Sequence, residues 1–261
     1  MKSSPKISVI MAVFRPDRAL FPLAVNSILA QSFRDFEFII VDDGNSIEDR
    51  KFLSECCLDE RITIVRNENN LGLTKSLNVA ISLAKGDLVA RQDADDFSEP
   101  NRFLEQVRFL ESNPGVGLLG TDYCLSYKHG KKIYTPSAGN IEIQMMYTNP
   151  FCHASVMLGK DLLQEIGGYD EKYKRSQDFE LWLRLLDRTE AAILPKVLVI
   201  RNEIEGISLS TTKASYSQFA NGVILRLKFI RSRNAFWLAP YFLIGTAYHL
   251  FRVIFRTLSV K

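Results

Sequence analysis

Three carboxylates crowd the end of one apolar segment of the chain. In LVARQDADDFSEP, residues 88–100, Asp93, Asp95 and Asp96 fall within four positions, directly after a run of strand character. Mg²⁺ and Mn²⁺ take oxygen ligands, and Mg²⁺ is usually held by one or two carboxylates together with substrate phosphates. Asp93 and Asp95 therefore predict a site that presents one carboxylate to a metal and another to a bound nucleotide. The alternative is that Asp95 or Asp96 caps a helix starting near residues 100–101.

A second acidic pair, Asp42 and Asp43, ends another strand-like segment, FEFIIVD. Gly44 follows, and glycine lets a chain turn sharply or approach a ligand closely. Asp-Gly is also a common turn dipeptide, so a simple turn is the alternative. Two acidic strand ends on one sheet edge are harder to attribute to turns than a single one, and they favour a binding site.

A third pair of carboxylates opens the helix expected in RSQDFELWLRL. Asp178 and Glu180 fall in its first turn, where acidic side chains cap the helix and complement its dipole. A carboxylate in this place can equally serve as a general base if it reaches an acceptor hydroxyl. The sequence leaves both interpretations open.

The first 120 residues alternate between strand-like and helical patterns. The segments ISVIMAVF, FEFIIVD, RITIVR and DLVARQ have strand length and β-branched residues, and apolar residues recur at helical spacing in residues 20–31, 73–84 and 103–110. This alternation predicts an α/β fold with a parallel sheet covered on both faces. Because ligands bind at the carboxyl ends of strands in such sheets, we expect the acidic clusters at residues 42–43 and 93–96 to share one edge.

A less regular half is expected after residue 120. The predicted elements are a strand in HASVML (153–158), a short helix in KDLLQEIGGYD ended by Gly167 and Gly168, an amphipathic helix over 177–188 and a strand over 193–200.

Length and composition indicate a globular protein with a basic end. A chain of 261 residues, 46% hydrophobic and 24% charged, suits one large domain or a domain with an appendage. The net charge of +3 hides an asymmetry, because residues 206–261 hold eight Lys or Arg and no Asp or Glu. The four cysteines lack metal-site spacing, which favours a reducing cytosolic setting, and the N-terminus is interpreted as a first strand rather than a secretory signal.

The C-terminal segment changes pattern. Residues 216–230 form an amphipathic basic stretch, and residues 235–251 carry no charge but include Pro240. Since a spanning helix needs about 20 apolar residues, we expect residues 214–256 to lie on a membrane surface instead. The alternative is a helical hairpin packed on the catalytic domain or on another subunit. The predicted domains are 1–212, divided at residue 120 into two halves, and a membrane-associating segment, 213–261.

These motifs, in this order, resemble the family 2 glycosyltransferases over roughly residues 5–210. The resemblance lies in residues 7–45 with IIVDDGN, in residues 67–114 with ARQDADD, and in residues 149–185 with NPFCHASVML and SQDFELWLRL. It implies a Rossmann-like nucleotide-diphospho-sugar transferase fold of GT-A type, with a mainly parallel central sheet. It also implies an inverting transferase that uses Mn²⁺ or Mg²⁺. For the predicted domain 1–212, the resemblance implies that the first half, 1–120, binds a nucleotide-sugar and that the second half, 121–212, faces the acceptor.

The resemblance assigns roles to individual residues. It implies that Asp43 and Asp42 contact the nucleotide base, that Asp93 lies against ribose or metal, that Asp95 is the principal metal ligand and that Asp178 is the catalytic base. Further residues expected at the site are Ala12, Phe14, Arg66, Asn70 and Lys75 toward the nucleotide-sugar, and His153 and Arg201. For His153, a structural role is the equal alternative. The sequence departs from the family pattern at Phe14-Arg15, at Gln177 and at Glu203.

The expected function is transfer of a sugar from a nucleotide-diphosphate donor, with a UDP-sugar favoured, to a saccharide or lipid-linked acceptor in surface polysaccharide or glycolipid assembly. We expect a cytoplasmic protein, peripheral on the inner face of the cell membrane, and no nucleic-acid partner. One alternative is a catalytically silent nucleotide-sugar-binding scaffold. Another is a nucleotidyltransferase of related fold, although no Gly-rich, Lys-containing triphosphate loop follows the first strand.

Overall fold

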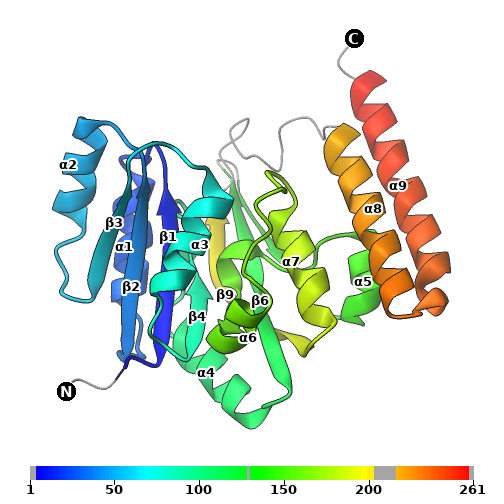
Figure 1. The fold of residues 1–261 in the computed structure, drawn as a ribbon, viewed down its shortest axis with the longest axis horizontal. Coiled ribbons are helices and arrows are strands. Elements are labelled where there is room, and N and C mark those ends of the chain that lie inside the picture. Colours follow the sequence, from blue (N-terminus) through cyan, green and yellow to red (C-terminus); the bar gives the residue numbers. More distant parts are fainter. Residues whose placement is uncertain (1–3, 128–129, 203–215, 259–261) are drawn as a thin grey trace.

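The computed structural model describes residues 4–127, 130–202 and 216–258, which form an α/β fold around one sheet (Figure 1). The sheet has the strand order β3-β2-β1-β4-β8-β6-β9-β5, and β7 pairs with β6. The strands are β1 (Ile7–Val13), β2 (Phe36–Asp43), β3 (Ile62–Asn67), β4 (Leu88–Arg91), β5 (Phe97–Ser98), β6 (Val116–Tyr127), β7 (Gly130–Tyr134), β8 (Met157–Gly159) and β9 (Glu190–Asn202).

Helices cover the sheet and extend it at the C-terminal end. The α-helices are α1 (Leu20–Leu29), α2 (Ile47–Cys56), α3 (Leu73–Leu83), α4 (Arg102–Ser112), α5 (Ile141–Tyr147), α6 (Lys160–Glu165), α7 (Gln177–Leu186), α8 (Tyr216–Ser232) and α9 (Ala239–Leu258). Two 3₁₀ turns, η1 (His153–Ser155) and η2 (Phe236–Leu238), complete the described elements.

The four strands β3-β2-β1-β4 are parallel, as the sequence predicts, and the α/β class is confirmed. Along β1, alternate residues face opposite sides: Val9 and Met11 pack with α1, α2 and α4, whereas Ile10 packs with α3. Beyond β4 the sheet becomes mixed, because β8 runs antiparallel to both β4 and β6. The chain leaves β1 toward β2 and later returns to its other side at β4, so the carboxyl ends of β1 and β4 border a topological switch point.

Two kinds of element differ from the sequence prediction. The segment HASVML is not one strand, because residues 153–155 form the 3₁₀ turn η1 and strand pairing begins only at Met157. The helices α2 and α5 were not predicted. Helix α2 buries only Leu53, so its sequence shows no apolar period. The start of the helix is fixed instead by Ser46, whose side chain accepts a hydrogen bond from the Asp49 backbone N.

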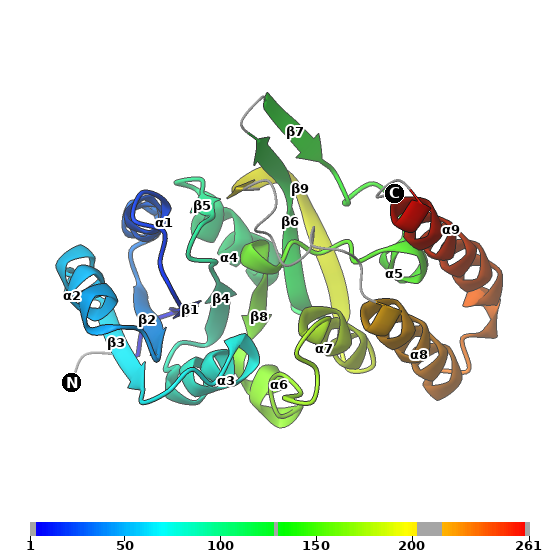
Figure 2. The same cartoon turned by 90° about the horizontal axis from the view of Figure 1, so that it is seen from above.

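The C-terminal helices pack against the rest of the fold. Helices α8 and α9 lie beside each other at one end of the molecule, next to α7 and α5 (Figure 2). Their buried residues Leu225, Phe229 and Phe242 join the same apolar cluster as Trp182 of α7. Within the described chain, no helix combines the length and the apolarity that crossing a membrane would need.

Candidate active site

Asp43, at the end of β2, holds the loop that precedes α3. Its Oδ1 accepts hydrogen bonds from Asn67 Nδ2 and the Leu71 backbone N, both at 2.8 Å, and its Oδ2 accepts one from the Gly72 backbone N at 2.9 Å. Asn70, expected near the donor, donates its side-chain amide to the Asp43 carbonyl at 3.3 Å. Asp43 therefore ties β2 to this loop, and contact with a nucleobase stays a prediction.

Asp42 faces the other side of the sheet and keeps one oxygen without a hydrogen bond. Its Oδ1 accepts from the backbone and side-chain nitrogens of Asn45, at 3.0 and 2.8 Å. Its buried Oδ2 lies 3.5 Å from Nε of both Arg50 and Arg66 and accepts no hydrogen bond from the described residues. The Arg66 side chain is half exposed, so it can turn from Asp42 to a ligand.

The end of β1 borders this edge of the sheet. Ala12 is partly buried beside Val41, and Phe14 is 46% exposed just beyond the strand. Arg15 has a φ of 51°, its backbone N donates to Asn45 Oδ1 at 2.6 Å, and its guanidinium lies over the Phe14 ring. The exposed ring of Phe14 offers a flat apolar surface at the place predicted for the nucleotide.

Asp93 follows β4 and is paired with a buried arginine. Arg91 Nη2 lies 2.5 Å from Asp93 Oδ1, and Arg91 is 1% exposed. Desolvation raises the pKa of the Asp93 carboxyl, but the charges of Arg91, first, and of Arg201 outweigh it and hold the pKa below its ordinary value. Asp93 is therefore charged and oriented before any ligand binds.

Asp95 and Asp96 have the opposite electrostatic character. Desolvation and the neighbouring charge of Asp93 raise the pKa of Asp95 to about 6, and the same causes raise that of Asp96 well above its ordinary value. Asp96 is 2% exposed and accepts a hydrogen bond from the Asn202 backbone N at 2.9 Å. Neither residue caps α4, whose N-terminal cap position is Asn101, so that alternative is wrong.

A buried polar network fixes the loop that carries these carboxylates, and the sequence prediction missed it. Arg102 is fully buried and donates to the Arg91 carbonyl at 2.9 Å, to Ser98 Oγ at 2.9 Å and to Gln92 Oε1 at 3.1 Å. Burial lowers the pKa of Arg102 to about 9, so the guanidinium stays charged at neutral pH. Its place in the first turn of an amphipathic helix gave no sign of burial.

His153 occupies the space between the Asp93 loop and α7. Its Nε2 and the Tyr169 hydroxyl are 2.7 Å apart, and its ring packs edge-on against Trp182. Burial, and next the charge of Arg91, lower the pKa of His153 to about 4, so the ring is neutral near pH 7. Asp93 and Asp178 both act electrostatically on this ring. The site therefore combines residues from two segments that are distant in the sequence.

Asp178 lies in the first turn of α7 and is partly exposed. Its Oδ2 accepts a hydrogen bond from Asn149 Nδ2 at 2.7 Å. Ser176, just before the helix, has a left-handed φ of 60°, which turns the chain sharply into α7. Gln177 is the first residue of the helix. The sequence prediction missed Asn149, although it begins the NPFCHASVML segment.

The end of β9 lies beside the loop that carries Asp93, Asp95 and Asp96. Arg201 acts electrostatically on Asp93, Asp95 and Asp96. Its own pKa is raised because Cys152, followed by Asp96 and Asp93, outweighs desolvation. The Asn202 side chain donates to the Asp95 carbonyl at 2.5 Å. Glu203, which departs from the family pattern, lies outside the described residues.

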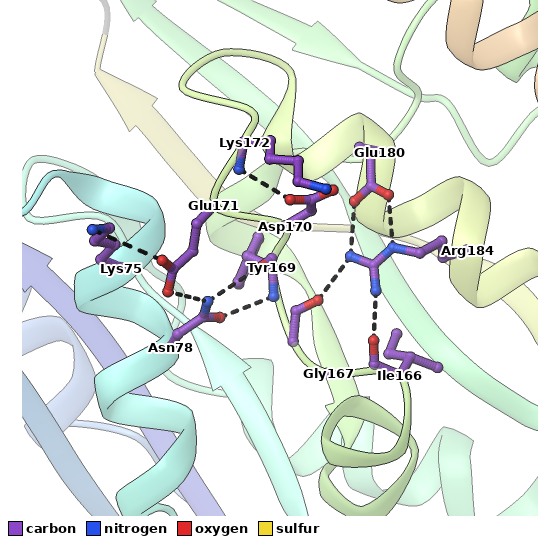
Figure 3. Close-up of a pocket in the computed structure, with 11 residues that line it drawn as sticks. Lys75, Asn78, Ile166, Gly167, Tyr169, Asp170, Glu171, Lys172, Glu180 and Arg184 are labelled. Carbon is purple, nitrogen blue, oxygen red and sulfur yellow. Dashed lines mark hydrogen bonds and ion pairs between the residues drawn. The ribbon is translucent and has the colours of Figure 1, made fainter.

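Lys75 lies apart from the carboxylate cluster, in an open hollow of about 740 Å³ between α3, the segment after α6 and α7 (Figure 3). Its Nζ is 3.9 Å from Glu171 Oε2. Across the hollow, Glu180 and Arg184 pair through two hydrogen bonds of 2.7 Å. Tyr169 lines the hollow and its hydroxyl reaches His153, so the hollow borders the site, although Asp93, Asp95 and Asp178 do not line it.

The donor set fits a hard divalent cation that is completed by a ligand. Among residues 4–127, 130–202 and 216–258, no three His, Cys, Asp or Glu side chains gather into a metal cage. Asp93 and Asp95 repel each other, as the raised pKa of Asp95 shows. One or two carboxylates, completed by the phosphate oxygens of a substrate, are the usual way in which proteins hold Mg²⁺.

A model of one protein family, "Glycosyl transferase family 2", matches residues 8–154. The amylovoran biosynthesis glycosyltransferase AmsE of Erwinia amylovora is 31% identical over 244 residues, which cover 91% of this chain and 88% of AmsE.

Two solved structures share the fold, and they confirm the predicted GT-A type α/β fold. S. aureus TarS 1–349 in complex with UDP-GlcNAc superposes with a TM-score of 0.70 at 18% identity, covering 92% of this chain and 79% of that one. The mannosyltransferase PcManGT from Pyrobaculum calidifontis, in complex with GDP-Man and Mn²⁺, gives a TM-score of 0.67 at 17% identity, covering 95% and 75%.

Proposed function

The chain belongs to glycosyl transferase family 2, and we propose that it moves a sugar from a nucleotide-diphosphate sugar to an acceptor hydroxyl with inversion at the anomeric carbon. The observation that carries this proposal is the meeting of Asp93 and Asp178 around His153, one from the end of β4 and one from the start of α7. A single displacement with inversion needs one base and no nucleophile from the protein.

The donor is proposed to lie across the carboxyl ends of β1, β2 and β4, with the nucleoside near Phe14, Arg66 and Asp42 and the sugar toward Asp93. Solved structures of similar fold carry UDP-GlcNAc in one case and GDP-Man in another, which supports a nucleotide-sugar as the donor class. We favour a UDP-sugar. Phe14 and Arg66 are each about half exposed, as residues that contact a ligand must be.

Asp95 and Asp93 are proposed to hold Mn²⁺ or Mg²⁺ together with the donor diphosphate. When bound, the cation neutralises the charge that builds on the diphosphate as the sugar departs. The Mn²⁺ complex of the mannosyltransferase supports the class of metal. Arg91 holds Asp93 in a fixed orientation toward this position.

Asp178 is proposed to be the general base. The acceptor oxygen attacks the anomeric carbon, the carbon–oxygen bond to the diphosphate breaks on the opposite face, and the acceptor proton passes to the Asp178 carboxylate. The alternative base would be His153, but its Nε2 is already paired with the Tyr169 hydroxyl at 2.7 Å. His153 is instead proposed to line the sugar site as a neutral group.

The proposed pathway context is surface polysaccharide or glycolipid assembly, with a saccharide or lipid-linked acceptor. The name of AmsE, a biosynthesis glycosyltransferase aligned over nearly its whole length with this chain, supports a role in making a glycan polymer.

The proposed membrane contact is the outer hairpin face, formed by exposed apolar residues of α8, η2 and α9. Its described members are Ile224, Leu227, Phe236, Trp237, Leu243, Ile244, Tyr248 and Leu250. Lys228 and Arg231 are exposed on α8 beside them. Apolar and aromatic side chains with neighbouring cations suit an interface with anionic lipid, such as the cytoplasmic leaflet, so we place the protein on the inner face of the cell membrane.

A donor panel tests the proposed function. The protein is incubated with UDP-glucose, UDP-galactose, UDP-GlcNAc or GDP-mannose, each with Mn²⁺, Mg²⁺ or EDTA. Thermal stabilisation and nucleoside diphosphate release are measured. We expect one donor to give both effects only with metal. Stabilisation without release from any donor would favour the silent scaffold, and pyrophosphate release from UTP with a sugar 1-phosphate would favour a nucleotidyltransferase.

A further inference from the structure

One buried arginine of the C-terminal hairpin contacts both α5 and α7. Arg226 of α8 is 9% exposed, and no carboxylate of the described residues lies within ion-pair distance of it. Burial lowers the pKa of Arg226 to about 10, so the side chain carries its charge at neutral pH. A buried cation without a carboxylate is costly unless other groups satisfy it.

Three contacts satisfy Arg226. One stays within α8, where Nη1 donates to the Gly222 carbonyl at 3.1 Å, and the other two reach different segments. Its Nε donates to the Met145 carbonyl in α5 at 2.7 Å. Its guanidinium carbon lies 4.5 Å from the centroid of the Phe179 ring in α7. A cation over an aromatic face is attracted to it, and more strongly when both are desolvated. Arg226 therefore joins the last turn of α5 to the first turn of α7.

The segments that include α5 and α7 also contain Asn149 and Asp178, which form the hydrogen bond at the proposed base. Phe179 directly follows Asp178, and Met145 lies four residues before Asn149. Asn149 Oδ1 accepts a hydrogen bond from the Phe151 backbone N at 3.2 Å, which directs its Nδ2 to Asp178 Oδ2 at 2.7 Å. The spacing between α5 and α7 thus sets whether this hydrogen bond forms.

We propose that Arg226 is a positioning residue for the reaction: by fixing α5 against α7 it holds Asn149 at Asp178 and so orients the Asp178 carboxylate toward the acceptor. The inference rests on the proposed role of Asp178 as base. It makes the C-terminal hairpin part of the catalytic apparatus, outside the stretch that the family model matches.

The test compares Arg226→Met, Arg226→Lys and a matched control, Arg233→Met. Arg233 also joins α8 to α5 and to the end of α7, through Glu142 and Asp187, but it does not contact Met145 or Phe179. The assay measures turnover and KM with UDP-GlcNAc and Mn²⁺, or with the panel donor of highest turnover. Thermal unfolding shows that each variant is folded.

We expect Arg226→Met to lower kcat roughly 10- to 100-fold with donor KM nearly unchanged, because a small misplacement of a reacting group costs about this much. Arg226→Lys, which keeps the cation, should recover part of the loss, and Arg233→Met should stay within about threefold of the wild type. In the Asp178→Asn background, Arg226→Met should cause no further loss, because residues that act as one unit are not additive.

A second readout does not depend on turnover. The side-chain amide resonance of Asn149 is assigned by its disappearance in Asn149→Ala. In Arg226→Met it should shift toward its position in Asp178→Asn, and in Arg233→Met it should not move. An unmoved resonance with wild-type kcat in Arg226→Met overturns the positioning role while leaving the base assignment intact. Wild-type turnover in Asp178→Asn overturns the base assignment itself.

Discussion

Arg91 and Asp93 form an ion pair in which Nη2 lies 2.5 Å from Oδ1 and the arginine is almost fully buried. Among the described residues, Asp95 forms no such pair, and the repulsion of Asp93 together with desolvation raises its pKa to about 6. The two carboxylates of the motif thus differ: Asp93 is neutralised by the protein, whereas the charge of Asp95 is left for a ligand to neutralise. This difference supports Asp95 as the principal metal ligand.

Asp95→Asn should therefore remove the metal-dependent part of donor binding. Changes in the outer shell of a metal site typically cost about 10- to 100-fold in affinity, and loss of a direct ligand should reach at least the upper end. Calorimetric titration of Mn²⁺ with the donor measures the effect. Asp161→Asn, the same change at an exposed position of α6, is the control and should bind normally. Equal affinities for the two variants would contradict the assignment.

In the metal-free protein, the free energy of unfolding should depend on pH through the ionisation of Asp95. Its folded pKa of about 6 lies above the ordinary value of 3.8, so the folded state binds this proton more tightly than the unfolded state does. The resulting stabilisation is present below about pH 4 and is lost as pH rises through 6. Asp95→Asn should thus gain stability relative to the wild type between pH 4 and 7. Urea unfolding at several pH values measures this, and a difference that does not change with pH would refute it.

Gly44 should be intolerant of a side chain for two reasons. Its φ is 73°, and an added Cβ would lie 2.4 Å from the backbone of Asn69 and Asn70, the loop that Asp43 holds. Left-handed strain of about 1–2 kcal/mol and overpacking of about 1–3 kcal/mol should together make Gly44→Ala cost about 2–5 kcal/mol. Gly167, with a φ of 79° and open space around it, should lose only the strain. Chemical denaturation measures both, and equal losses would show that the loop can move away.

The sequence indicates the acidic positions of the site but not the groups that orient them. Asp43 and Asp93 lie at the ends of strands and Asp178 opens a helix, so the local sequence pattern predicts these positions. Local pattern does not predict the burial of Arg91 and Arg102, because charged residues on apolar elements are normally exposed and only the tertiary network satisfies these two.

The contact between Asn149 and Asp178 also escapes prediction, because it joins residues 29 positions apart. Its geometry depends on α5, which follows from a local cap at Asn140 rather than from an apolar pattern, and on a C-terminal helix. Of the two uses considered for that C-terminal segment, packing on the catalytic domain is what the described residues show. Contact with a membrane stays a prediction.

Binding to anionic vesicles should depend on the outer hairpin face. Because α8 and α9 supply core residues, substitution tests this better than truncation. Leu243→Gln with Ile244→Gln removes two exposed apolar side chains and should weaken binding to phosphatidylglycerol vesicles at least about tenfold, judged from the free energy of burying such side chains. The matched control is Leu58→Gln with Ile47→Gln, both more than 80% exposed and located elsewhere. Equal co-sedimentation of the two double variants would exclude this face.

Asp178 is proposed to be the base of an inverting transfer, and the whole mechanism depends on this role. The most direct measurement is the rate of sugar transfer by Asp178→Asn, beside its donor affinity in the presence of Mn²⁺ and beside Asp187→Asn as a control from the other end of α7. We expect a loss of at least about 100-fold in rate, as is typical of a general base, with donor affinity unchanged and the control fully active. Transfer by Asp178→Asn at the wild-type rate would contradict it.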